Sequence, residues 1–477
     1  MRDIPVLSVA DRLRTENPWW EPSGSIARQY LDMKPRPYLA LFSPLATDRT
    51  VRRAVVLLGP RRVGKTVMIH HQIQALLDAG VNPKSILYAS IDHPLYNGLS
   101  LDQILKVYTE ATGCDPYREE TFLFFDEIQY LRNWESYVKA LVDGCFPAKC
   151  IVSGSAAAAL RLKSVESGAG RFTDFMLPPL TFYEYTELTG KRDSIERPSD
   201  AGTFLSIRQP ADIPRLNSHF LDYLNFGGYP ELALSPTIQS NPARFVKSDI
   251  IDKVLLRDLP GLYGIQDVQE LNYLFTTLAF NTAGEVSLEE LSKKSGVAKN
   301  TIRRYMEYLE AAFLIRIVHR VDRDARHFQR ATRFKIYLTN PSIYAALFSP
   351  IEDGQSAMGS LTETAVFAQW FHSPAILHYA RWRDGEVDIV SMNAEQRVDM
   401  AVEVKWSDRC VEDYGQIRSL VRFCKSQGLS TCLVTTKSES ARKKCDGVAV
   451  EFLPASLYCY ILGNNILFNK ALNQVHL

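Results

Sequence analysis

The sequence has no long apolar run, no cysteines at metal-binding spacing and no excess of either charge. None of its apolar stretches approaches the length of a membrane span, and the first twenty residues, MRDIPVLSVADRLRTENPWW, contain no apolar signal core. The eight cysteines include no C-x-x-C pair and no nearby histidine cluster, which argues against a disulfide framework or a zinc site. These absences predict a cytoplasmic protein that makes no membrane contact.

The charge balance also limits the choice of partners. With 55 basic and 54 acidic residues and a net charge of +1, the chain is not a generally basic protein. Any contact with nucleic acid must therefore come from a local basic patch. The length of 477 residues is too great for one hydrophobic core and predicts about three domains.

The most specific motif follows the apolar run at residues 55–58. Glycine, lysine and threonine complete the pattern G-x-x-x-x-G-K-[ST], with a predicted strand before it and a predicted helix after it. The glycines let backbone amides turn toward an anion, and the helix dipole adds positive charge behind them. We therefore expect ATP and Mg²⁺ to bind here, with Lys65 on the phosphates and Thr66 on the metal ion. The nucleotide-contacting set is Gly59, Pro60, Arg61, Arg62, Val63, Gly64, Lys65, Thr66 and Val67.

Two acids end a second buried strand. The segment TFLFFDEIQY has four apolar residues followed by Asp126 and Glu127. Acids at the carboxyl end of a parallel strand face the crevice where open α/β sheets bind ligands. We expect Asp126 to hold the metal ion and Glu127 to act as the general base.

Two further segments offer contacts to the nucleotide. The strand CIVSGSA ends in Ser153 and Ser155, which would contact the γ-phosphate or cap the next helix. Ser155 is included in the predicted cofactor set. Arg171, directly before the apolar segment 172–177, would serve either as a finger that reaches a neighbouring subunit or as an ordinary surface residue. The first interpretation of Arg171 requires a homo-oligomer, and a ring would satisfy it.

A helix-turn-helix pattern follows in residues 266–347. SLEELSKKSG opens with a capping box, and a second helix starts near Asn300 with Arg303 and Arg304 in its first turns. The following segment is rich in basic residues, as phosphate contacts require, and predicts a basic wing. Packing or oligomerisation is the alternative use of such a module. The basic residues of the predicted wing are Arg316, Arg320, Arg323, Arg326, Arg330, Arg333 and Lys335.

The last segment contains a second acidic constellation. Glu363 lies on a predicted helix, Asp388 on a strand, and Glu403 with Lys405 on the next strand, two residues apart and on one face. An acid on one strand and E-x-K on the next is the PD-(D/E)xK nuclease arrangement. Carboxylates at these positions would hold divalent ions that activate water, and the lysine would orient that water.

These motifs together resemble a family of bacterial and archaeal AAA-type (AAA+) ATPases whose C-terminal restriction-endonuclease-like domain was long of unknown function. The resemblance rests on GPRRVGKT, FFDEIQYLRNWE, SGS, GAGRF, GGYPE and on EVD with EVK. It implies an α/β fold, ATP hydrolysis through Lys65, Thr66, Asp126 and Glu127, and a nuclease-like C-terminal site. TNPSI, at residues 339–343, replaces an aspartate-glycine pair of the relatives, so no role is carried over from that aspartate.

The leading hypothesis is an oligomeric ATPase that binds DNA and cleaves it with a metal-dependent nuclease site. The alternative is a nucleotide-gated switch for DNA or protein binding, in which the nuclease-like domain is inactive. The adjacent Trp19 and Trp20 would stack on a base or anchor the N-terminal arm, and the sequence leaves both open. The expected organisation is an N-terminal extension (1–48), an ATPase core (49–190), a linker with helical lid (191–265), a winged-helix module (266–347) and a nuclease-like domain (348–477).

Overall fold

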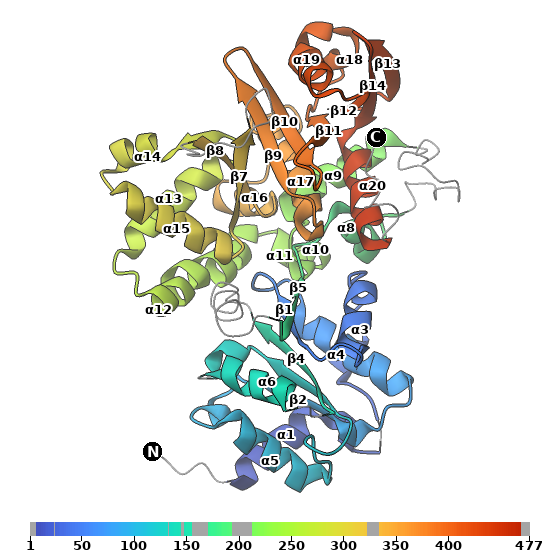
Figure 1. The fold of residues 1–477 in the computed structure, drawn as a ribbon, viewed down its shortest axis with the longest axis vertical. Helices are drawn as coiled ribbons and strands as arrows, with labels where there is room; N and C mark the ends of the chain where they lie inside the picture. The colour runs from blue at the N-terminus through green and yellow to red at the C-terminus, as the bar shows by residue number, and fades with distance from the viewer. Residues whose placement is uncertain are drawn as a thin grey trace. The chain divides into compact units, whose positions relative to one another are not determined.

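The computed structural model describes residues 6–22, 24–131, 133–144, 147–154, 170–192, 212–321 and 333–468. The chain divides into two compact units, Met1–Leu177 and Pro178–Leu477, each with its own core (Figure 1). The ATPase core was expected to run to residue 190. Instead α8 (Phe182–Thr189) belongs to the second unit, because it packs against the helix α20 (Ala455–Phe468).

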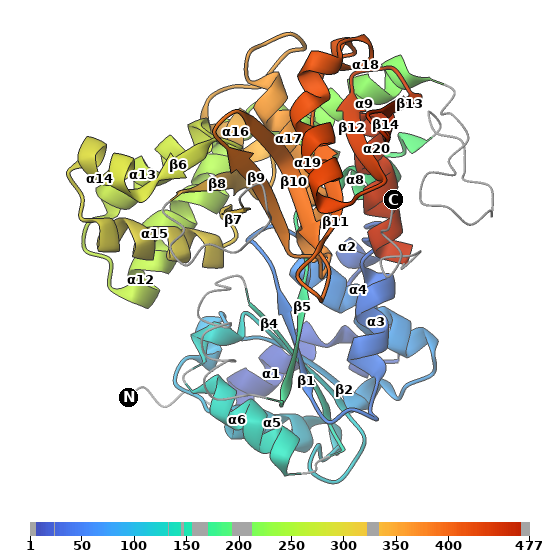
Figure 2. The ribbon, with the colours of Figure 1, turned by 45° about the horizontal axis from the view of Figure 1, so that its top comes forward.

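The first unit is a five-stranded parallel sheet with strand order β2-β3-β4-β1-β5. Helices α3 and α4 lie on one side of its strands and α5 and α6 on the other (Figures 1 and 2). Both faces are covered, so the central strands are continuous buried runs, as parallel sheets require. Its elements are α1 (Val6–Glu16), α2 (Arg28–Leu31), α3 (Leu39–Thr47), β1 (Ala54–Leu58), α4 (Lys65–Asp78), β2 (Ile86–Ser90), α5 (Leu101–Thr112), β3 (Phe122–Asp126), α6 (Trp134–Asp143), β4 (Lys149–Gly154) and β5 (Phe172–Met176).

The N-terminal segment covers the edge strand β2. The indole groups of Trp19 and Trp20 both donate to the Ile86 carbonyl, at 3.1 and 2.8 Å. Asn17 exchanges two hydrogen bonds with the backbone of Tyr88, at 2.8 and 2.7 Å. The tryptophan pair therefore anchors the N-terminal arm and satisfies a strand edge that would otherwise be open to pairing.

His70 on α4 makes the first unit sensitive to acid. Its ring is buried and stacks on Tyr30 with centroids 3.9 Å apart. Burial lowers the pKa of His70 from 6.5 to about 3, and the neighbouring His71 adds to the effect. The folded chain thus holds His70 neutral, whereas the unfolded chain protonates it below pH 6.5.

We expect the unfolding free energy of the first unit to fall by about 2 kcal/mol between pH 7 and pH 5, the energy of roughly 1.5 pKa units. The stabilisation that comes from keeping His70 neutral is complete above pH 6.5 and is lost as the pH falls toward 3. Urea unfolding followed by tryptophan fluorescence at both pH values measures it. His70→Phe should flatten this dependence, while the same change at the less buried His93 should not. An equal pH dependence in wild type and His70→Phe would contradict the assignment.

The second unit is built on a nine-stranded mixed sheet of order β13-β14-β12-β11-β10-β9-β7-β8-β6 (Figures 1 and 2). Its strands are β6 (Glu285–Ser287), β7 (Ile315–Val321), β8 (Arg333–Leu338), β9 (Leu377–Trp382), β10 (Gly385–Met392), β11 (Val398–Glu403), β12 (Thr431–Thr436), β13 (Ala441–Cys445) and β14 (Val448–Pro454). The remaining elements are α9 (Ile213–Phe226), α10 (Pro230–Leu234), α11 (Pro236–Gln239), two π-helical segments (Ala243–Asp252 and Val254–Asp258), α12 (Leu259–Tyr263), α13 (Val268–Phe280), α14 (Leu288–Ser295), α15 (Lys299–Ala311), α16 (Ser342–Leu347), α17 (Met358–Gln369), α18 (Arg409–Glu412) and α19 (Arg418–Gln427).

The predicted helical module and the predicted C-terminal domain share this sheet. Strand β7 pairs with β8 on one side and, in parallel, with β9 on the other, through Arg320 with Tyr379 and Val321 with Ala380. The boundary expected near residue 347 is therefore crossed by backbone pairing, and the two segments form one unit.

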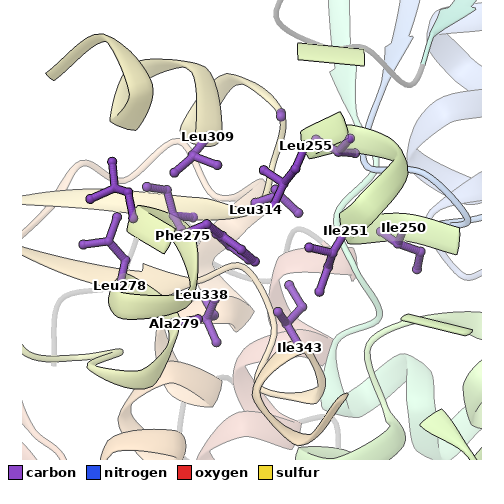
Figure 3. Packing of buried hydrophobic residues seen from close by; sticks show 14 of the residues in the cluster. Ile250, Ile251, Leu255, Phe275, Leu278, Ala279, Leu309, Leu314, Leu338 and Ile343 are labelled. Atoms are coloured by element: carbon purple, nitrogen blue, oxygen red, sulfur yellow. The ribbon is translucent and has the colours of Figure 1, made fainter. Parts of the chain in front are cut away.

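One apolar cluster of this unit joins the π-helical segments to α13, α15 and α16. Figure 3 shows Leu255 and Ile251 of the π-helical segments facing Phe275 and Leu278 of α13, with Ile343 below. The π-helical segments were expected to form an ATPase lid. They pack instead within the core of the second unit, together with α13, α15 and α16.

Candidate functional site

The loop between β1 and α4 has the backbone that phosphate binding needs. Gly64 has a left-handed backbone, with φ of 97°, and is the N-cap of α4, which begins at Lys65. A side chain at Gly59 would place its Cβ 2.4 Å from the Leu177 carbonyl oxygen, so only glycine fits there. The Lys65 ammonium donates to the carbonyls of Gly59 and Pro60, at 3.0 and 2.8 Å. The lysine is thus held over the loop where a polyphosphate would lie.

Asp126 lies at the end of β3, across from this loop. Strand β4 separates β3 from β1 in the sheet, so Ser153, the residue before its last, lies between the loop and the acid. Three hydroxyl groups contact the carboxylate of Asp126: Thr66 at 2.6 Å, Tyr88 at 3.1 Å and Ser153 in a very short hydrogen bond. Burial raises the pKa of Asp126 above its ordinary value, and the neighbouring Glu127 carboxylate adds to the rise.

This environment fits a divalent cation. Hydroxyl groups rather than an ammonium or guanidinium contact Asp126, so its charge is left for a metal ion, and oxygen atoms are the ligands that Mg²⁺ prefers. Thr66 and Asp126 were both predicted as metal ligands and meet within hydrogen-bonding distance. The two residues that would hold Mg²⁺ are therefore brought together from positions 60 residues apart.

Glu127 follows in a left-handed conformation, with φ of 52°. Its backbone amide donates to the Ser153 hydroxyl at 3.3 Å, and its carboxylate accepts from the Gln129 amide at 2.5 Å. Of the two serines left open by the sequence, Ser153 is thus a strand residue that links Asp126 to Glu127. Ser155 lies outside the described residues.

Two residues of this site carry no sequence motif. Arg36, in the N-terminal extension, is buried and donates to the Val63 carbonyl of the phosphate loop at 2.8 Å. Tyr88 reaches Asp126 from the adjacent strand β2. The pairing of β2 with β3 places Tyr88 near the acid, and the sequence contains no signal for that pairing.

Arg171 lies at the far end of the sheet from the phosphate loop. It directly precedes β5, whose other end, Met176, pairs with Leu58 beside the loop. Its guanidinium contacts Asp143 at 2.5 Å. It therefore does not reach the loop of its own chain, and a role across a subunit interface stays a prediction.

The second acidic constellation comes together within the second unit. Glu363 lies on α17, Asp388 on β10 at a bulge against β9, and Glu403 at the end of β11. Lys405 was expected on the same strand as Glu403 but lies two residues beyond the end of β11, and its ammonium contacts Glu403 at 2.6 Å. Burial raises the pKa of Glu363 to about 7 and of Glu403 to about 8, and the Asp388 carboxylate adds to both shifts. The four residues predicted from the sequence are thus neighbours.

A fifth residue changes the chemistry of this cluster. The ammonium of Lys335, from β8, contacts Glu386 at 2.6 Å, Glu363 at 2.8 Å and Asp388 at 3.2 Å. Among the described residues, no three histidine, cysteine or acidic side chains are arranged to hold a metal ion. Lys335 would have to give way for Glu363 and Asp388 to hold a metal ion, because its ammonium already contacts both carboxylates, and the metal-ligand role of Glu403 stays a prediction.

Four of the seven basic residues of the predicted wing lie in the described part of the chain, and each of them contacts an acid or an aromatic ring. Lys335 is buried in the acidic cluster, and Arg320 and Arg333 both contact Glu285, at 3.8 and 3.4 Å. The Arg316 guanidinium lies 5.3 Å from the ring centre of Phe371. Strand alternation was the sequence signal that could have separated Lys335 from the predicted wing surface, since it puts Lys335 and Tyr337 on the face opposite Phe334 and Ile336. Arg323, Arg326 and Arg330 lie outside the described residues.

Two segments of the chain match family models of known proteins. Residues 51–186 match a family model described as an AAA domain, and residues 217–353 match one described as a domain of unknown function, DUF8612. Two uncharacterized proteins of Methanocaldococcus jannaschii are 26% and 24% identical over 274 and 265 residues, or 55% and 54% of this chain. These matches cover 56% and 55% of those proteins, so the chain spans a little over half the length of these curated relatives.

Among solved structures, the Orc1 protein of Aeropyrum pernix in complex with DNA is 12% identical, with a TM-score of 0.31, over 69% of this chain and 95% of that one. The Hsp104–ADP complex of S. cerevisiae is 13% identical, with a TM-score of 0.27, over 64% of this chain and 40% of that one. No helix in the part of the chain that the structure describes could cross a bilayer. Residues 51–186, which include the parallel sheet and the loop between β1 and α4, thus resemble an AAA domain, and residues 217–353 resemble a domain of unknown function.

Proposed function

We propose that this protein hydrolyses ATP in its first unit and uses the nucleotide state to control DNA binding by its second unit. The observation that carries the ATPase is the convergence of Lys65, Thr66, Asp126 and Glu127 at one edge of a parallel sheet. The match of residues 51–186 to an AAA domain supports the same activity.

Each residue has a distinct part in this proposal. The loop amides and Lys65 bind and orient the phosphates, while Thr66 and Asp126 would hold Mg²⁺. A bound Mg²⁺ supplies neutralisation of charge on the phosphate oxygens. Glu127 accepts a proton from the attacking water, and Ser153 fixes its position through the backbone amide. Arg171 would act on the nucleotide of a neighbouring subunit in a homo-oligomer.

The DNA-binding part rests on α14 and α15. The order α13, β6, α14, α15, β7, β8 is that expected of a winged helix, in which the second helix of the pair enters the major groove. Arg303 and Arg304 are exposed in the first half of α15. Since Arg320, Arg333 and Lys335 are engaged by acids, the helix rather than the hairpin is proposed as the DNA contact.

Measuring ATP turnover with and without duplex, single-stranded and four-way branched DNA tests the coupling, with strand cleavage recorded in the same samples. Stimulation by one form of DNA would support the proposal and identify the substrate. Turnover that is indifferent to every form would refute the link between the two units, and no turnover at all would refute the ATPase itself.

We expect Arg303→Ala/Arg304→Ala to weaken DNA binding at least tenfold at low salt and to reduce the slope of log K against log salt by about two, because two phosphate contacts are lost. Fluorescence anisotropy over a salt series measures both quantities. Arg418→Ala/Arg422→Ala removes two exposed arginines from α19 and is the matched control. Equal binding by the two double variants would exclude α15 as the contact.

A second candidate function is metal-dependent DNA cleavage by the C-terminal residues. The order α17, β9, β10, β11, α19, β12 and the closeness of Asp388, Glu403 and Lys405 favour it. Lys335 opposes it. Mg²⁺-dependent cleavage that Asp388→Ala abolishes would establish this activity.

A further inference from the structure

Lys335 contacts two of the three carboxylates that the sequence predicts as ligands of a divalent ion, Glu363 and Asp388. Its ammonium has carboxylate oxygens of Glu386, Glu363 and Asp388 at 2.6, 2.8 and 3.2 Å. These separations are normal for an ammonium group and exceed the ~2.0–2.1 Å at which Mg²⁺ binds oxygen. The carboxylates are therefore spaced around a lysine and would have to move inward to hold Mg²⁺.

Both carboxylate oxygens of Asp388 and one of Glu363 already accept hydrogen bonds, whereas Oε2 of Glu403 is buried without a hydrogen-bond partner. One oxygen of Asp388 accepts from Lys335 and the other from the Val404 amide at 2.9 Å. The same oxygen of Glu363 accepts from Lys335 and from the Tyr337 hydroxyl, at 2.8 and 2.6 Å. A metal ion on Asp388 or on this oxygen of Glu363 would therefore compete with donors that the fold itself holds in place.

The backbone keeps Lys335 in this position. Strand β8 is paired on both sides, with Glu285 of β6 and Val318 of β7 opposite Lys335. The side chain is 3% exposed and also lies 5.5 Å from the ring centre of Tyr379. Withdrawing the ammonium would require a change in a doubly paired strand, so it is a resident group of the cluster.

We propose that the Lys335 ammonium replaces the divalent cation of this cluster, so that the wild-type cluster binds neither Mg²⁺ nor Mn²⁺ and acquires a divalent-cation site only when Lys335 is removed. The lysine instead ties β8 to α17 and β10 through charge. This inference is independent of ATP hydrolysis and of DNA binding by α15, because it concerns residues that neither activity uses.

Mn²⁺ binding to the nucleotide-free full chain tests the proposal, with free Mn²⁺ read by electron paramagnetic resonance. Lys335→Met should bind one more Mn²⁺ per chain than wild type. Its affinity for that ion should be at least tenfold higher than the affinity of any Mn²⁺ site that the wild-type chain loses on Asp388→Asn. Lys335→Met/Asp388→Asn should lose that ion. Lys405→Met removes the other lysine, which pairs with Glu403 alone, and should gain none.

Two outcomes would overturn the proposal. The first is a wild-type chain that binds Mn²⁺ in a site that Asp388→Asn abolishes, and the second is a folded Lys335→Met that gains no ion. The comparison of wild type with Asp388→Asn needs no lysine variant, so it decides the question even if Lys335→Met does not fold. The loop between β1 and α4 is unchanged in all these proteins, so any Mn²⁺ bound there contributes equally to each measurement.

Discussion

Replacing Glu127 with glutamine is expected to lower ATP turnover by roughly 10²–10⁴-fold while ATP binding stays within about twofold of wild type. In the proposed mechanism, the carboxylate accepts the proton of the attacking water. Glutamine preserves its size and can still contact Gln129, which lies 2.5 Å from the carboxylate. Binding should survive because the phosphates are held by the loop, Lys65 and Thr66, which the change does not touch.

Steady-state phosphate release and fluorescent-nucleotide binding measure the two effects separately. Glu119→Gln makes the same chemical change at an exposed residue just before β3 and should leave both quantities unchanged. If Glu127→Gln hydrolysed ATP at the wild-type rate, the assignment of the general base would be wrong. If it lost binding as well, Glu127 would be a structural residue, since its left-handed backbone is a place where strain could arise.

Replacing Lys335 with methionine is expected to lower the unfolding free energy of the second unit by about 3–5 kcal/mol. Methionine fills a similar volume but removes the positive charge from among Glu363, Glu386 and Asp388. Burial alone would lower the pKa of Lys335, and these carboxylates outweigh it and hold the pKa above its ordinary value. The loss is large because buried carboxylates are left without their cation.

Urea unfolding in the presence of EDTA measures this change without interference from metal ions. Arg333→Met is the matched control, because Arg333 lies on the same strand and its side chain is 52% exposed in its contact with Glu285. We expect that variant to lose less than about 1 kcal/mol. Equal losses in the two variants would show that Lys335 is not the central charge of the cluster.

Much of the proposed nucleotide site follows from local sequence. The loop needs glycine at fixed positions, a lysine at the helix start and an apolar strand before it, so the spacing alone predicts the loop and α4. The run of four apolar residues before Asp126 predicts a buried parallel strand for the same reason. These features are determined by neighbours in the chain, and the sequence is enough to place them.

The partners of these residues depend on strand order, which is not a local property. Tyr88 contacts Asp126 because β2 lies beside β3, and Ser153 lies between the loop and the acid because β4 lies between β1 and β3. Arg36 supports the loop from a segment that carries no motif. Long-range packing decides all three contacts, so they could not be read from spacing.

For the C-terminal cluster, the sequence by itself determined that Glu363 lies on a helix and that Asp388 and Glu403 lie on two strands of suitable order, with Lys405 two residues beyond Glu403. Only the tertiary structure decided that β7 pairs with β9, which merges two expected domains into one sheet. That pairing carries β8 and Lys335 to the carboxylates. An ammonium group that is attractive to DNA on an isolated hairpin is then neutralised by acids more than 25 residues away in the chain, because burial makes a lone charge too costly.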